Sequence, residues 1–126
     1  MKIQLKHWIV EDLKFKIDNK KSRKGAFELG YGAHFPESNR EFHIPFKISI
    51  KDADFIISST VVYVFEVDKE IDEEFKNSPF VSINAPAIAF PYLRAFLSNF
   101  TLQAGFQPIV LPSINFVEFS QKNKKV

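Results

Sequence analysis

The sequence predicts an α+β fold in which the strands come first and the helices last. Three observations lead to this prediction. Apolar and polar residues alternate over most of the first half, whereas apolar residues recur at helical spacing only after Pro91. Residues 77–117 carry a single charge, Arg94. Such a segment is expected to form a buried core, an oligomer interface or an apolar binding surface.

Alternation predicts strands within residues 1–18, where Leu13, Phe15 and Ile17 show the pattern, and over residues 26–34, 42–50 and 55–67. Short polar turns between these segments favour an antiparallel sheet.

Individual residues refine the strand assignments. Residues 55–67 carry apolar side chains on both faces of the predicted strand. This pattern predicts a central strand that is covered on both faces. Pro45 predicts that residues 42–50 lie at an edge or contain a bulge, because proline cannot donate to the ladder. Residues 75–83 are a further strand candidate, weakened by Pro79.

A helix is predicted from Pro91, which suits a first turn, to Gly105, which suits a C-terminal cap. Ser113 is expected to cap a short final helix that runs to about Gln121. The length of 126 residues suits one domain over residues 1–126.

Composition excludes several functions. No cysteine is present, so disulfides, thiolate catalysis and cysteine zinc sites are absent, which fits the cytoplasm. The three histidines have no partners at metal-ligand spacing. His34 and His43 flank one turn and are interpreted as surface imidazoles, with an approach across a hairpin as the alternative. No catalytic motif is found, and no secretory signal is seen.

Prolines divide the apolar segment, so no membrane insertion is expected.

Charge is distributed in runs. Basic residues crowd positions 14–24 and recur at Lys122, Lys124 and Lys125, and acidic residues crowd positions 66–74. Each run is expected to be a solvated surface, with docking of an oppositely charged partner as the alternative.

The apolar segment contains an ordered series of motifs that resembles the C-terminal half of the SecB protein-export chaperone family. The match covers about a third of the chain. It consists of Asn84-Ala85-Pro86, Phe90-Pro91-Tyr92-Leu93-Arg94, Gly105-Phe106 with Pro108, Leu111-Pro112 and Asn115-Phe116.

The resemblance implies a four-stranded antiparallel sheet followed by two C-terminal helices. It also implies a chaperone without enzymatic activity, cofactor or metal, which holds non-native polypeptides in apolar grooves. Such proteins form homodimers or homotetramers and pass clients to SecA. This chain departs from the export type, because it is mildly basic and its short tail is rich in lysine. A client-specific chaperone, for example of a toxin–antitoxin system, is therefore a second possibility.

Two groups of residues are candidates for function. An apolar connecting loop is unusual, and we expect it to bind clients together with two aromatic residues of the long strand. This group comprises Tyr63, Phe65, Phe106, Ile109, Val110 and Leu111. The helical stripe is expected to be core or oligomer interface, and it comprises Leu93, Phe96, Leu97 and Phe100. Arg94 lies next to the stripe and is expected to be an ion-pair or cap residue near that interface.

Two other classes of function compete with the chaperone. A scaffold on the same fold would use its apolar surface only for oligomerisation. A nucleic-acid binder would use the basic run, but the aromatic-rich half carries almost no positive charge, so nucleic acid is not the expected partner.

Overall fold

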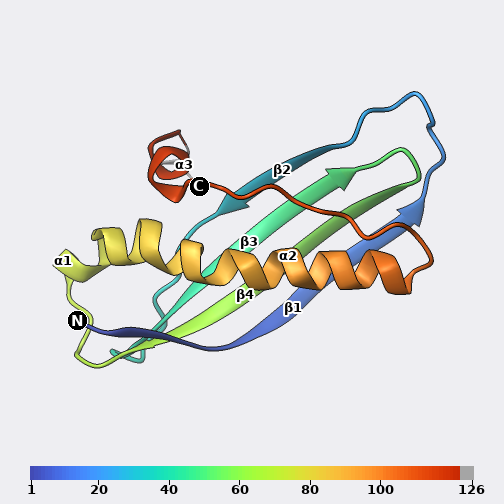
Figure 1. Ribbon diagram of the computed structural model, residues 1–126. Helices are drawn as coiled ribbons and strands as arrows, with labels where there is room; N and C mark the ends of the chain where they lie inside the picture. The colour runs from blue at the N-terminus through green and yellow to red at the C-terminus, as the bar shows by residue number, and fades with distance from the viewer. Residues whose placement is uncertain (123–126) are drawn as a thin grey trace. The chain divides into compact units, whose positions relative to one another are not determined.

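The computed structural model describes residues 1–122 and divides into two compact units (Figure 1). The first unit covers residues 1–71 and the second begins at Asp72. Lys124 and Lys125 of the basic tail lie outside the described residues. One domain over residues 1–126 stays a prediction, and each unit is described by itself.

The first unit is the predicted antiparallel sheet. It contains β1 (Ile3–Ile17), β2 (Ala26–Tyr31), β3 (Glu41–Lys51) and β4 (Phe55–Val67), in the spatial order β1-β4-β3-β2 (Figure 1). Every neighbouring pair is antiparallel. The prediction that residues 55–67 form a central strand is therefore confirmed.

One face of the sheet carries the apolar side chains that the alternation predicted. Phe42, Phe65 and Tyr63 lie on it, and the rings of Phe42 and Phe65 stack with centroids 5.2 Å apart. The residues of this face with no exposed surface are Phe42, Ile44, Phe46, Ile57, Val61, Tyr63 and Phe65. The expectation that β4 is covered on both faces was wrong, because Ser58 and Glu66 are exposed on the opposite face. Antiparallel sheets commonly leave one face in water.

Strand β1 is a long edge strand with two irregularities. It pairs with β4 from Ile3 to Ile17, and the register shifts between Leu5 and His7 and again between Val10 and Asp12. Each shift places one extra residue in β1, as a β-bulge does. The shifts break the alternation of the sequence in the first half of this strand.

The prediction that Pro45 marks an edge or a bulge was wrong, because β3 lies between β4 and β2. Pro45 pairs with Val62 without a register shift. The pairing of β2 with β3 ends at Tyr31, and beyond it the Gly32 N–H donates to the Pro45 carbonyl at 3.3 Å. The N and C=O of one strand residue point to the same side, so the missing N–H of proline falls on the side where the β2 ladder has ended.

The second unit begins with two short helical segments in place of the further strand suggested for residues 75–83. Helix α1 (Glu73–Lys76) is capped by the Asp72 carboxylate, which accepts from the Phe75 N–H at 2.8 Å. A π-helical turn, η1 (Phe80–Asn84), leads directly into α2. The strand suggestion was wrong because Asp72, Glu73 and Glu74 form a helix N-terminus, which favours negative charge.

Helix α2 (Ala85–Gln103) starts earlier than predicted. Pro86 occupies the first turn and Pro91 lies inside the helix. Because Ala89, Phe90 and Leu93 around Pro91 are buried, their packing offsets the missing N–H of this proline. The expectation that Pro86 and Pro91 interrupt the apolar segment was therefore wrong, whereas Pro108 and Pro112 lie in the loop after the helix. By length and composition, residues 80–103 are able to cross a membrane, a test that the core helix of a soluble protein also passes.

The end of α2 follows the prediction. Gly105 adopts φ of 100°, a backbone conformation that favours glycine. The following loop leads to α3 (Phe116–Lys122). The cap of α3 is Asn115 rather than the predicted Ser113, because the Asn115 side chain accepts from the Val117 N–H at 3.0 Å and from the Glu118 N–H at 3.3 Å.

Candidate functional site

The loop after α2 is held against the helix by one buried hydroxyl. The Thr101 side chain, which has no exposed surface, donates to the Leu97 carbonyl at 2.9 Å and accepts from the Ile109 N–H at 2.9 Å. The Phe106 N–H donates to the Thr101 carbonyl at 3.1 Å. These bonds make the loop run back along α2, as the course of the chain in Figure 1 shows.

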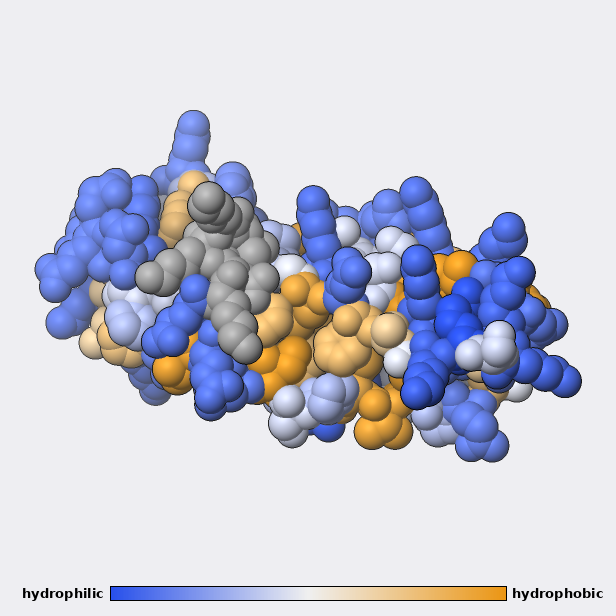
Figure 2. Space-filling view, turned by 90° about the horizontal axis from the view of Figure 1, so that it is seen from above, coloured by the Kyte–Doolittle hydropathy of each residue, from blue (hydrophilic) through white to orange (hydrophobic). Residues whose placement is uncertain are grey.

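The predicted loop residues differ sharply in exposure. Leu111 is buried, Ile109 and Phe106 are half-buried, and Val110 is 80% exposed. The loop is thus anchored by Thr101 and Leu111 while it presents Val110 to solvent. We call residues 109–111 the lip. Figure 2 shows that apolar side chains reach the molecular surface in patches between hydrophilic residues.

A small hollow of about 200 Å³ lies between α2 and the lip. Its walls are the three lip residues together with Arg94, Ala95 and Ser98. Arg94 is half-exposed, and its guanidinium has no hydrogen bond or ion pair among residues 1–122. The hollow therefore places an apolar wall beside a free set of N–H donors, which suits an apolar side chain next to a carbonyl or carboxylate.

The two predicted strand residues, Tyr63 and Phe65, lie on the apolar face of β4 and have no exposed surface. The Tyr63 ring contacts Trp8 at 5.6 Å and Phe46 at 5.7 Å between centroids. The Tyr63 hydroxyl has no hydrogen-bond partner within the described part of the chain. Burial raises the pKa of Tyr63, so the phenol stays neutral. These residues belong to the first unit and the lip to the second, so their predicted juxtaposition stays a prediction.

The residues predicted for the helical stripe fall into two sets. Leu93 and Leu97 have no exposed surface. Phe96 and Phe100 are half-buried, with ring centroids 6.3 Å apart. Their role, and that of Arg94, as an oligomer interface stays a prediction.

Two exposed apolar groups were missed by the sequence reasoning. One lies on α2, where Ile88, Tyr92 and Leu102 are 40%, 46% and 56% exposed. Their spacing of four and ten residues places them near one helix face, a pattern that was visible in the sequence. The other lies at the centre of β1, where Trp8, Ile9 and Val10 are 42%, 53% and 40% exposed. The bulges hid this second group, since they interrupt the alternation.

The two histidines approach each other across the turn, which was the alternative interpretation. His34 and His43 form an isolated antiparallel bridge, and their ring centroids are 5.6 Å apart. His43 Nε2 lies 2.8 Å from a Glu41 carboxylate oxygen. No group of three or more metal-ligating side chains occurs within residues 1–122.

The sheet followed by a long helix and a returning loop defines a class of α+β domain that solved structures also contain. The Rv1957 SecB-like chaperone of Mycobacterium tuberculosis, solved in complex with a ChAD peptide from the Rv1956 HigA1 antitoxin, matches with a TM-score of 0.69. The match covers 89% of this chain and 90% of that chain at 10% identity. A protein of unknown function from Streptococcus agalactiae matches with a TM-score of 0.57 at 14% identity, over 89% of this chain and 98% of that chain.

The chain belongs to the SecB family. The family model described as preprotein translocase subunit SecB matches residues 12–126. The protein-export protein SecB of Herminiimonas arsenicoxydans is 34% identical over 98 residues, which cover 78% of this chain and 57% of that protein. The protein-export protein SecB of Roseobacter denitrificans is 37% identical over 71 residues, which cover 54% and 42%. The chain therefore spans about half the length of the curated relatives that it matches.

Proposed function

We propose that this protein is a holdase chaperone, which binds unfolded or non-native polypeptides by contact alone, without catalysis or a cofactor, and acts in the cytoplasm. Membership of the SecB family supports the proposal. The observation that carries it is the lip, where Val110 is 80% exposed although both of its neighbours are tied down. A loop that is fixed and still exposes an apolar side chain is suited to bind one.

The proposed mechanism is the burial of client apolar side chains. Removing apolar surface from water stabilises a complex by roughly 25 cal/mol per Å² and requires no particular sequence. Ile109 and Val110 would contact the apolar side chain, and Arg94 would donate to a carbonyl or carboxylate of the client. Phe106 and Leu111 would support this surface, whereas client contact by Tyr63 and Phe65 stays a prediction, because both are fully buried in the first unit.

The test is suppression of the aggregation of an unfolded model protein, followed by light scattering. We expect the wild-type chain to suppress aggregation and Val110→Asp to lose most of this effect. Val117→Asp is the matched control, since Val117 is 49% exposed on α3 and lies outside the lip. Equal activity of the two variants would remove the lip from the proposal, and no suppression by the wild-type chain at equimolar amounts would refute the general holdase.

We further propose that the chain forms homodimers or homotetramers through its two exposed apolar groups. The β1 edge offers unpaired backbone groups beside Trp8, Ile9 and Val10, and α2 offers Ile88, Tyr92 and Leu102 with the flanking Phe96 and Phe100. Leu93 and Leu97 would support this helix face from beneath. Ile9→Lys and Tyr92→Lys should each lower the mass measured by light scattering. A wild-type mass of one chain would refute the oligomer, and an unchanged oligomeric mass in both variants would exclude these two groups as its interface.

A client-specific chaperone is the second candidate, because a structural neighbour of this chain was solved with an antitoxin peptide. It predicts that purified protein carries one dominant polypeptide and fails to protect unrelated model proteins. A scaffold would neither suppress aggregation nor carry a bound polypeptide, but it would keep its oligomeric mass. Binding of purified SecA would support the export version of the general proposal.

A further inference from the structure

The sheet has a second face that the proposed chaperone mechanism does not use. Three rows of paired residues cross it near the loop between β1 and β2. They are Ala26–Lys51–Ile56–Lys16, Glu28–Ser49–Ser58–Lys14 and Gly30–Lys47–Thr60–Asp12. We call these twelve residues the polar face. Residues between them, such as Leu29 and Ile48, point to the opposite side and are buried, because side chains alternate along a strand.

Lysines flank a shallow trough on the polar face. The central strand β4 contributes the short side chains of Ser58 and Thr60, while Lys47 lies on β3 and Lys14 on β1. Lys16 and Lys51 face each other across Ile56 of β4, about 10 Å apart. Lys47 faces Asp12 across Thr60, and Lys14 lies in the row between these two. An extended chain laid along β4 would therefore have an ammonium group on each side.

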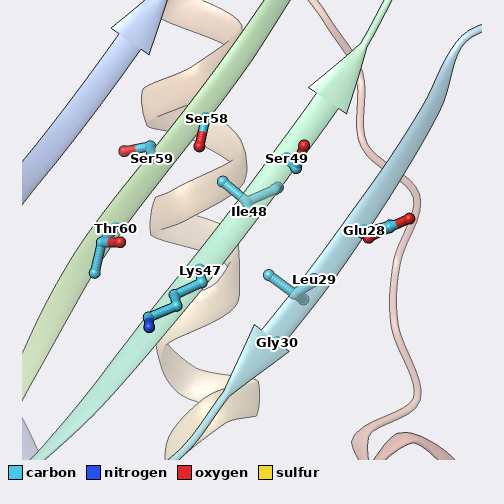
Figure 3. Close-up of a pocket in the computed structure, with 9 residues that line it drawn as sticks. All are labelled: Glu28, Leu29, Gly30, Lys47, Ile48, Ser49, Ser58, Ser59 and Thr60. Carbon is cyan, nitrogen blue, oxygen red and sulfur yellow. The ribbon is translucent and has the colours of Figure 1, made fainter.

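The structure contains a hollow over the adjacent part of the polar face. It has a volume of about 390 Å³ and lies over β2, β3 and β4. Figure 3 shows Lys47 and Ser49 on β3 beside Ser58 and Thr60 on β4, with Gly30 of β2 contributing no side chain. Hydroxyl groups thus line the floor of the hollow, and they both donate and accept hydrogen bonds.

The charge of the polar face is unbalanced. Lys14, Lys16, Lys47 and Lys51 are exposed, and no side-chain hydrogen bond or ion pair occupies them within residues 1–122. Asp12 and Glu28 are the acidic residues of the same rows. The adjoining loops add the exposed Lys20, Lys21 and Lys24 against Asp52 and Asp54, while Arg23 pairs with Asp18. Four unpaired lysines against two carboxylates attract a ligand of negative charge.

The polar face lacks the groups that bind single-stranded nucleic acid. Every Phe, Tyr and Trp residue of the four strands lies on the apolar face, as the pairing register shows. Single-strand binders combine positive charge with exposed aromatic rings on which bases stack. Hydroxyls between lysines instead suit carboxylates and an extended backbone.

We propose that the polar face is a docking surface for an acidic, extended polypeptide segment, separate from the apolar client surface. Lysines of β1 and β3 pair with its carboxylates, and Ser49, Ser58 and Thr60 exchange hydrogen bonds with it. This surface gives the chain a second partner class that is selected by charge rather than by apolar area.

The test uses a labelled peptide made only of glutamate and serine, so that the lip has no apolar group to bind. Fluorescence anisotropy should show binding that weakens as salt rises. The double variant Lys14→Glu/Lys47→Glu should weaken binding about tenfold or more. Lys2→Glu/Lys69→Glu is the matched control, with the same change in net charge at exposed lysines outside the polar face.

Further arms separate this proposal from the chaperone proposal and from nucleic acid. Val110→Asp should bind the acidic peptide as the wild-type chain does, whatever its effect on aggregation. A lysine–serine peptide of equal length should not bind. Three results would each overturn the proposal. They are equal losses of binding in the two double variants, no binding of the acidic peptide at low salt, and tighter binding of a single-stranded RNA of equal length.

Discussion

The Tyr63 hydroxyl is fully buried and lacks a hydrogen-bond partner among residues 1–122. A buried polar group without a partner costs about 1–3 kcal/mol. Tyr63→Phe removes only the hydroxyl, so we expect the free energy of unfolding to rise by about 1 kcal/mol in urea denaturation. Tyr92→Phe, at a side chain 46% exposed, should change it by less than about 0.5 kcal/mol. A less stable Tyr63→Phe variant would mean that the hydroxyl is bonded in solution.

Thr101 is the residue that couples the lip to α2. Thr101→Val keeps the shape but leaves the Ile109 N–H without its acceptor, which should lower the free energy of unfolding by about 1–2 kcal/mol. Thr101→Ser retains the hydroxyl and should lose less. We also expect Thr101→Val to bind an unfolded client more weakly, because the lip is no longer fixed. Client affinity equal to that of Thr101→Ser would show that the anchor does not matter for binding.

At the scale of elements, the end of α2 depends on one glycine. Gly105 has φ of 100°, and a Cβ added there would meet no atom within 4 Å. Gly105→Ala should therefore cost about 1 kcal/mol through backbone strain alone. Gly25→Ala is the control, since its Cβ would lie in ordinary contact, 3.6 Å from an Asp52 carboxylate oxygen. Thermal unfolding of both variants measures the difference, and equal midpoints would contradict the strain argument.

Elements were predictable where a local pattern was complete. The alternation of β3 and β4 and the glycine after α2 each specify structure through neighbouring residues, and these predictions were confirmed. The start of α2 was misplaced because Pro86 and Pro91 both suit a first turn, and only tertiary packing decides between them. Strand β3 was wrongly predicted to lie at an edge or to contain a bulge at Pro45. Its place between β4 and β2 depends on long-range pairing, which a single proline does not specify.

At the scale of the whole molecule, buried phenols make stability depend on alkaline pH. Burial raises the pKa of Tyr31 and of Tyr63 above the ordinary value of 10.0. Above about pH 10 the unfolded chain releases these protons while the folded chain retains them, so the free energy of unfolding falls as pH rises. The urea midpoint should therefore decrease above this pH. Tyr63→Phe should show a smaller decrease, and an equal decrease would exclude Tyr63 as a source.

The apolar chemistry of the lip was predictable from the sequence, but the exposure of its individual side chains was not. The uncharged loop indicated an apolar surface, yet the sequence does not show that Leu111 is buried and Val110 exposed, since both are aliphatic and adjacent. Burial of Leu93 and Leu97 beside the exposed Tyr92 depends on the rotation of the helix. The polar face was also beyond the sequence, because Lys14 and Lys47 are brought together only by the pairing of β1 and β3 with β4.

The two bulges of β1 carry a consequence for aggregation. An edge strand with exposed apolar residues is a template for fibre growth, and fibre-forming segments are about six or seven residues long. Between the bulges, only His7, Trp8, Ile9 and Val10 pair regularly with β4. Because bulges increase the local twist, this strand resists the flat stacking that a fibril requires. The same irregularities that hid β1 from sequence analysis thus make its exposed edge a poor template for an endless series of strands.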